Sequence, residues 1–185
     1  MDDSQGFSLI EVLVALVLIA TGMLGMLALQ SKSIQYTQDS VNRNLAITLS
    51  NDLLEMMRTH RQQLFNHTPP EYPSYSELKS ATAIYSASGA LRLQAESCPT
   101  ASVPQRLLEH ANCWFKLVET HLPGAKDADV NAEFKLCPSF KSGACAGSGY
   151  QGSSLELQLA WRVKQGECMD DLAATVCTYR TRVEL

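Results

Sequence analysis

Cysteine is absent from the first 97 residues of this 185-residue chain, which include its long apolar run. The six cysteines are Cys98, Cys113, Cys137, Cys145, Cys168 and Cys177. None are spaced as C-x-x-C, and no closely spaced pair has a histidine within a few residues, so the pattern argues against a zinc site. An even count confined to the second half instead indicates three disulfides formed in an oxidising compartment such as the periplasm.

The pairing of these cysteines is open, because six cysteines allow many connectivities. We favour pairing in sequential order, since each such pair lies in a separate local segment and closes a short loop. The expected disulfides are Cys98–Cys113, Cys137–Cys145 and Cys168–Cys177.

Signatures of catalysis are also missing. The chain has no HExxH motif, no nucleophile elbow, no phosphate-binding glycine loop and no carboxylate pair at a telling spacing. Its four histidines are scattered, and we interpret each as a surface or helix-end residue: His60, His67, His110 and His121. The sequence therefore predicts no enzyme activity, no cofactor and no metal.

Basic charge is scarce, with 15 Lys and Arg against 19 Asp and Glu and a formal charge of −4. This balance argues against nucleic acid as a bulk partner. One basic group stands out, and neighbouring strands could place several of its members on one sheet face: Arg162, Lys164, Arg180 and Arg182. A solvated strand face is the default interpretation, and contact with DNA or a partner protein is the alternative.

The longest apolar run carries a single charge. Residues 6–29, GFSLIEVLVALVLIATGMLGMLAL, contain Glu11 and otherwise only apolar or small residues. The 18 residues behind that glutamate would form a helix of about 27 Å, which nearly spans the hydrocarbon core of a bilayer. An ionisable group costs roughly 2.5–3.5 kcal/mol at the bilayer centre, so Glu11 is expected to have a function and a partner.

Residues 6–11, GFSLIE, followed by an apolar run, resemble the class III leader junction of type IV pilins and pseudopilins. The resemblance implies that a prepilin peptidase cuts after Gly6 and that Phe7 becomes the N-methylated first residue. It also implies that Glu11 meets the amino terminus of a neighbouring subunit in a filament. The physical chemistry agrees, because an ammonium partner offsets the cost of a buried carboxylate. A plain membrane anchor with Glu11 at the headgroups is the alternative.

Further segments are similar to the PilV family of minor pilins, the type IV pilus modification proteins. They are GMLGMLALQ at 22–30, IQYT at 34–37, LLEMMR at 53–58, LAWR at 159–162 and CTYRTRVEL at 177–185. The similarity implies an α+β type IV pilin fold, in which a long N-terminal helix packs on a C-terminal antiparallel sheet. It also implies a minor pilin that helps to initiate pilus assembly and joins a tip complex, supporting twitching motility and adhesion.

The resemblance also implies partners and a location. The partners are other minor pilins, the major pilin, the prepilin peptidase and, as a further candidate, a tip adhesin. The protein would cross the bacterial inner membrane once, with a periplasmic C-terminal domain, and then enter the pilus. Two alternatives stay open: an I-type minor pseudopilin of a type II secretion system, and a minor pilin that binds DNA or a surface. The six cysteines and LLEMMR fit PilV better than the smaller I-type pseudopilin.

The domain organisation expected from these features has three parts. Residues 1–6 are a leader peptide, residues 7–29 the membrane and filament-core helix, and residues 30–185 the globular domain. The globular domain would contain an amphipathic helix over 30–66, a loop and helix region over 67–129 and a sheet region over 130–185. Removal of the two leader aspartates would leave a net charge of −2. Because the leader lacks Lys and Arg, against the positive-inside tendency, we expect a segment upstream or a trimmed start.

Periodicity supplies the finer expectations. An apolar stripe predicts one long helix from residue 7 to about 65, and a second stripe predicts a helix over 104–122. Alternation predicts strands over 153–163 and 176–185 and favours one over 130–137. Residues 78–93 are ambiguous, a short helix followed by a strand near 90–95 being one interpretation. The strands would form an antiparallel meander whose apolar face rests on the amphipathic half of the long helix.

Overall fold

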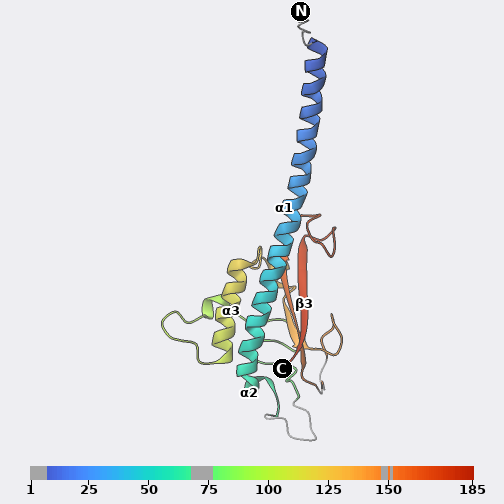
Figure 1. The fold of residues 1–185 in the computed structure, drawn as a ribbon. Coiled ribbons are helices and arrows are strands. Elements are labelled where there is room, and N and C mark those ends of the chain that lie inside the picture. The colour runs from blue at the N-terminus through green and yellow to red at the C-terminus, as the bar shows by residue number, and fades with distance from the viewer. Residues whose placement is uncertain (1–7, 68–76, 147–149, 151) are drawn as a thin grey trace, which may run out of the picture. The chain divides into compact units, whose positions relative to one another are not determined.

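The computed structural model describes residues 8–67, 77–146, 150 and 152–185. Its elements are the helices α1 (Leu9–Thr59), α2 (Arg61–Leu64), α3 (Leu107–His121) and α4 (Ala128–Asn131), the 3₁₀ helix η1 (Ala95–Ser97), and the strands β1 (Lys135–Pro138), β2 (Ser154–Arg162) and β3 (Val176–Glu184) (Figure 1). The α+β class predicted from the sequence, with a long N-terminal helix and a C-terminal antiparallel sheet, is confirmed.

The chain divides into two compact units, Met1–Gln38 and Asp39–Leu185. In the first unit the described residues form the N-terminal part of α1, and nearly all of its side chains are exposed. The second unit holds the rest of α1 and every other element. The division of the chain after residue 29 remains a prediction.

Within the second unit, α1 is amphipathic. The apolar residues that it buries lie on one face, as spacings of three and four positions place them, with Leu53 and Leu54 side by side: Ala46, Leu49, Leu53, Leu54 and Met57. They belong to one hydrophobic core that α3 and β2 complete. Trp114 of α3 fixes the contact between the two helices, because its buried indole N–H donates to the Leu49 carbonyl at 2.7 Å.

Helix α1 ends at Thr59, six residues before the predicted end. Two side-chain groups contact the carbonyl of Met56 at this point: the Thr59 hydroxyl lies 2.8 Å away and His60 Nδ1 3.0 Å. The backbone N–H of His60 meanwhile bonds the carbonyl of Met57, in the tighter 3₁₀ pattern. These local bonds compete with the α-helical ladder, so the helix stops and a separate short helix α2 follows. Residues 68–76, the first part of the expected loop and helix region, lie outside the described residues.

The three strands form one antiparallel sheet in the order β1-β2-β3. Leu157 at the centre of β2 stands opposite Leu136 of β1 and Thr181 of β3. The apolar face of β2 carries Leu155, Leu157, Leu159 and Trp161 into the core. Trp161 reaches α1 directly, since its indole N–H donates to Asp39 at 3.2 Å.

Two expected elements differ from the structure. The strand expected over 130–137 begins only at Lys135, because the start of that range belongs to the helix α4 (Ala128–Asn131). The extended residue Asp127 directly precedes the first turn of α4. Over 78–93 the chain forms no helix; it makes isolated bridges, Tyr85 to Leu91 and Ala90 to Lys135. The second bridge depends on a residue far along the chain and neither extends into a strand ladder, so a local pattern does not predict them.

Helix α3 begins at Leu107, three residues after the predicted start. The Glu109 carboxylate accepts the backbone N–H groups of Gln105 at 2.8 Å and Arg106 at 3.4 Å. These bonds satisfy donors at the helix start and hold the pKa of Glu109 below its usual range. The start of α3 is therefore set by this carboxylate.

Candidate functional site

Helix α1 begins directly beside the only acidic residue of the apolar run. The N–H groups of Glu11 and Val12 bond the carbonyl of Ser8 at 3.0 and 3.3 Å, which closes the first turn. Glu11 lies in that turn with an exposed side chain, where a negative charge complements the helix dipole. In the described part of the chain, no basic group lies within ion-pair distance of this carboxylate. Gly6 and Phe7, the predicted cleavage site, lie outside the described residues.

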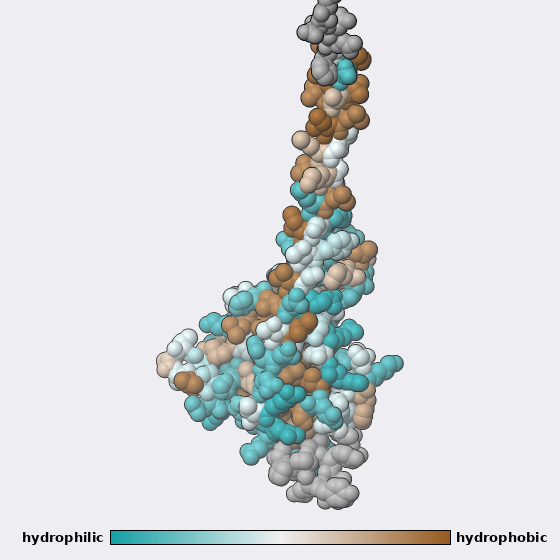
Figure 2. Space-filling model, in the orientation of Figure 1, coloured by the Kyte–Doolittle hydropathy of each residue, from teal (hydrophilic) through white to brown (hydrophobic). Residues whose placement is uncertain are grey.

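The segment after Glu11 exposes large apolar side chains all round the helix. Figure 2 shows the hydrophobic surface on one face of the first part of α1. Leu16, Val17, Leu18 and Ile19 are each more than half exposed. Helix α1 is the one helix of the described chain that is long and apolar enough to cross a membrane, and its apolar window is 0% buried. Because water disfavours so much apolar surface, this segment requires lipid or other protein around it.

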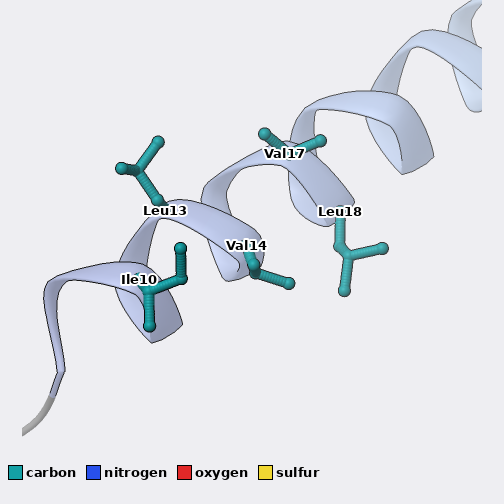
Figure 3. Close-up of a pocket in the computed structure, with 5 residues that line it drawn as sticks. All are labelled: Ile10, Leu13, Val14, Val17 and Leu18. Carbon is teal, nitrogen blue, oxygen red and sulfur yellow. The ribbon is translucent and has the colours of Figure 1, made fainter.

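A shallow groove runs along one side of this segment (Figure 3). Its walls are Ile10, Leu13, Val14, Val17 and Leu18. These positions follow the i, i+3, i+4, i+7, i+8 pattern of a helix face, and the groove contains no polar side chain. Such a surface can receive lipid chains or the apolar side chains of another helix, and it offers nothing to a polar ligand.

The few polar or small residues of the segment are compatible with an apolar environment. The Thr21 hydroxyl is 3.0 Å from the carbonyls of both Val17 and Leu18, so its donor is satisfied within the helix. A Cβ added at Gly22 or Gly25 would meet no heavy atom within 4 Å. Both glycines therefore leave open surface at which another helix backbone could approach closely.

The four basic residues singled out from the sequence do not act as one group. Arg162 bonds two carboxylates, Asp127 at 2.8 Å and Asp129 at 2.6 Å. The hydrogen bond from Arg162 holds the pKa of Asp129 below its usual range, and the two carboxylates raise the pKa of the guanidinium. Arg162 thus connects the end of β2 to the start of α4. Lys164 lies beyond the strand, and its backbone N–H donates to the Glu167 carboxylate.

Arg180 and Arg182 lie together on β3, opposite Gln158 and Glu156 of β2. Arg180 donates to the side-chain oxygen of Gln158, and Arg182 donates to the carbonyl of Phe140 at 2.6 Å. Both arginines remain exposed. The sheet therefore presents two of the four cations beside the loop that follows β1.

Three disulfides join Cys98 to Cys113, Cys137 to Cys145 and Cys168 to Cys177. The partners follow each other along the chain, and each bond lies in the second unit. The bonds tie η1 to α3, close the loop after β1, and join the β2–β3 connection to β3. All three fasten connections that little regular structure supports, which is where a cross-link restricts the chain most.

Sequence reasoning missed two arrangements. His60 and His110, which the sequence shows as scattered, have ring centroids 5.4 Å apart. Asp39 is 1% exposed and accepts N–H bonds from Trp161 at 3.2 Å and Met169 at 3.3 Å. A buried acid in a polar stretch of helix has no local signature, so only the fold reveals it. Among the described residues no group of three or more His, Cys, Asp or Glu is placed to hold a metal.

The comparisons with known proteins bear on the N-terminus. The family model described as the prokaryotic N-terminal methylation motif matches residues 1–27, which include the GFSLIE junction and the start of the exposed apolar helix. No curated protein and no solved structure matches the chain. Together with the α+β fold, the motif supports a subunit of the type IV pilin or pseudopilin type, processed by a prepilin peptidase and assembled with other such subunits.

A subunit of this type is anchored in the inner membrane by its N-terminal helix before assembly, and the apolar helix of this chain fits that role. The class is structural rather than enzymatic.

Proposed function

We propose that this chain is a minor pilin of the PilV type, which helps to initiate a type IV pilus and joins other minor pilins in a complex at or near its tip. The observation that carries the proposal is the methylation motif over residues 1–27, which includes the start of an apolar helix whose membrane-length window is 0% buried. Inserted in a membrane, and later among other helices, that surface would be removed from water.

The proposed mechanism has two steps. The peptidase removes residues 1–6 and exposes the amino group of Phe7, which is then N-methylated. Glu11 of each helix next docks beside the amino terminus of a neighbouring subunit, and the attraction between the two charges orders the apolar helices. An ion pair inside an apolar bundle favours one register over others, because any other register leaves a charge unpaired. Contacts of the soluble domain would determine which subunits lie beside this one, and these include the major pilin and a tip adhesin.

The methylation motif is equally compatible with the second candidate function, an I-type minor pseudopilin of a type II secretion system. The three disulfides and the LLEMMR segment favour the PilV type. The genes beside this one separate the candidates: pilus minor pilins and an adhesin support the first, and secretion pseudopilins with a secretin support the second.

The decisive experiment is mass spectrometry of the N-terminus of the membrane-extracted protein, from cells with and without an active prepilin peptidase. We expect a chain that begins at N-methylated Phe7 when the peptidase is active, and a chain that retains Gly6 when it is absent. A chain that retains Gly6 in the presence of active peptidase would reduce the segment to a plain anchor and overturn the proposal.

A further inference from the structure

We propose that Phe140, Lys141, Arg180 and Arg182, together the Phe140 surface, bind an acidic patch on another pilin-type subunit. The inference rests on the proposed function and gives it a specific contact in the soluble domain. Three features carry it: an exposed aromatic ring on a rigid support, a loop fixed by several independent bonds, and a cluster of cations on an acidic protein.

Phe140 is exposed but held in place. Its side chain is 68% exposed, and its ring centroid lies 4.4 Å from that of Tyr150. Tyr150 is itself buried, and its hydroxyl group bonds both the N–H and the carbonyl of Ser154, at 3.0 Å each. The exposed ring thus rests on a second ring that is anchored to the start of β2. A large ring presented in one orientation loses little conformational entropy on binding, which favours it as an anchor.

The loop that carries Phe140 is fixed by bonds of three kinds. The Cys137–Cys145 disulfide closes it at its base. The N–H of Gly143 donates to both carboxylate oxygens of Glu156, at 2.8 and 3.0 Å. The Ser139 hydroxyl group lies 2.7 Å from the carbonyl of Lys141 and 2.8 Å from that of Ala144.

Gly143 is required at its position, because its φ of +84° suits glycine and a Cβ there would lie 3.2 Å from the Arg180 guanidinium. Arg180 therefore passes directly over the loop. Arg182 contacts it as well, through the bond to the carbonyl of Phe140 at 2.6 Å. These contacts bring two cations of β3 beside an aromatic residue about 40 positions earlier in the sequence.

The charge of the surface indicates its partner. Lys141, Arg180 and Arg182 are exposed, whereas the Glu156 carboxylate behind them is 6% exposed and bonded to the loop. The cluster is thus positive on a chain whose formal charge is −4. Complementarity then favours a partner that presents carboxylates around a site for one apolar ring.

Nucleic acid fits this surface less well than a protein. Proteins that bind duplex DNA neutralise many phosphates with Lys and Arg, and single strands are held by successive aromatic platforms. The Phe140 surface offers three cations and one exposed ring, and Arg162 lies at the other end of β2, bound to two aspartates. Because aromatic and arginine side chains dominate the hot spots of protein interfaces, the composition favours a protein partner.

The test uses the full mature chain in detergent and measures its affinity for each pilin-type subunit encoded beside its gene, purified in the same detergent. We expect one subunit to bind, and Phe140→Ala to weaken that binding about tenfold, which corresponds to about 1.4 kcal/mol. The double variant Arg180→Glu, Arg182→Glu should weaken it further, and raising the salt from about 50 to 300 mM should weaken the wild type.

Matched controls separate this surface from a general loss of structure. Val103→Ala removes another exposed apolar side chain and Lys116→Glu reverses another exposed charge, on α3, and neither should change the affinity. Arg180→Lys with Arg182→Lys keeps the charge and should bind within about threefold of the wild type. Circular dichroism should show the same folded signal for every variant.

Three results would overturn the inference. The first is binding of a subunit that Phe140→Ala and the double charge reversal leave unchanged. The second is no binding of any subunit at low salt. The third is binding of a fluorescent 20-nucleotide DNA, single- or double-stranded, that the charge reversal abolishes while subunit binding persists. Processing at Phe7 would be normal in each case, so failure here leaves the proposed function standing.

Discussion

At the scale of single residues, Glu11 has two competing explanations. A carboxylate in the first turn of α1 stabilises the helix start by itself, by roughly 0.3–1 kcal/mol at an exposed site. The proposed assembly contact requires more, because it needs a charge of the opposite sign from another subunit. The two explanations differ in what they predict for a neutral side chain of the same shape.

We predict that Glu11→Gln and Glu11→Ala insert into the membrane as well as the wild type and enter filaments poorly. Insertion should not suffer, because a charge in an apolar segment costs up to roughly 3 kcal/mol. Incorporation should fall at least several-fold, since the amino terminus of the neighbouring subunit loses its partner. The measurement is the ratio of protein in sheared pili to protein in membranes, by immunoblot.

Gln30→Ala, a polar residue beyond the apolar run, serves as the control for this ratio. Normal pilus number and normal incorporation of Glu11→Gln would assign the charge to the helix start alone.

Asp39 is the other acid whose position needs an explanation. Its buried carboxylate accepts N–H bonds from Trp161 and Met169, so it joins α1 to β2 and to the disulfide-bonded connection after it. We predict that Asp39→Ala lowers the free energy of unfolding by about 1–3 kcal/mol, because it leaves the buried indole N–H of Trp161 and the partly buried N–H of Met169 without their acceptor. Thermal unfolding in detergent, followed by circular dichroism, measures the effect.

The exposed Asn51 of the same helix supplies a control, and Asn51→Ala should change the free energy of unfolding by no more than about 0.5 kcal/mol. Equal stability of the two variants would show that the bonds to Asp39 contribute nothing net.

At the scale of elements, the sequence predicts some parts of the fold well. Strands β2 and β3 alternate apolar and polar residues, and α3 carries a continuous apolar stripe, so local patterns place all three within a few residues. The prediction for residues 78–93 is wrong because this segment makes isolated bridges, two of them to Phe65 and Lys135 outside it, and forms no helix or regular strand. The burial of Glu156 and Gln158 on the other face of β2 has no local signature either, because it depends on Gly143 of the loop after β1 and on Arg180 of β3.

The same distinction applies to the candidate site. The junction at 6–11 is contiguous, so the sequence alone displays it. The Phe140 surface combines a loop and a strand, and Arg182 meets Phe140 only because strand register brings them together. The basic group taken from the sequence included Arg162, which the fold instead commits to Asp127 and Asp129.

The ion pairs of Arg162 connect the end of β2 to α4 and predict a pH dependence. The arginine lowers the pKa of Asp129, so the pair stabilises the fold above the ordinary aspartate pKa, and this contribution is lost as the pH falls through the lowered value. We predict that Arg162→Met raises the pKa of Asp129 toward its ordinary range. An NMR titration of the Asp129 carboxyl group measures it.

Lys164→Met removes a nearby cation that bonds neither aspartate, and it should leave that titration unchanged. A pKa of Asp129 that stays low in Arg162→Met would assign the shift to the backbone N–H groups of α4 instead of the guanidinium.

At the scale of the whole molecule, the two units differ in how far their large apolar side chains are exposed to water. The described part of the first unit leaves its large apolar side chains uncovered, whereas the second buries its own around α1, α3 and β2. A chain with an uncovered apolar helix and a complete separate core is suited to an anchored state and to a later state in which other helices replace lipid. Under the proposed function, removal of residues 1–6 is the step that permits the change.

We predict that Gly6→Val blocks this step, because the branched side chain fills a position where the peptidase requires a small residue. The precursor should then accumulate in the inner membrane and be absent from sheared pili, while the second unit folds normally and keeps its disulfides. Mass spectrometry of the membrane fraction should find a chain that retains residues 1–6, and Ser4→Ala should be processed like the wild type. A chain beginning at Phe7 in the Gly6→Val variant would show that the junction at 6–7 does not depend on glycine, and the assignment of the leader would fall with it.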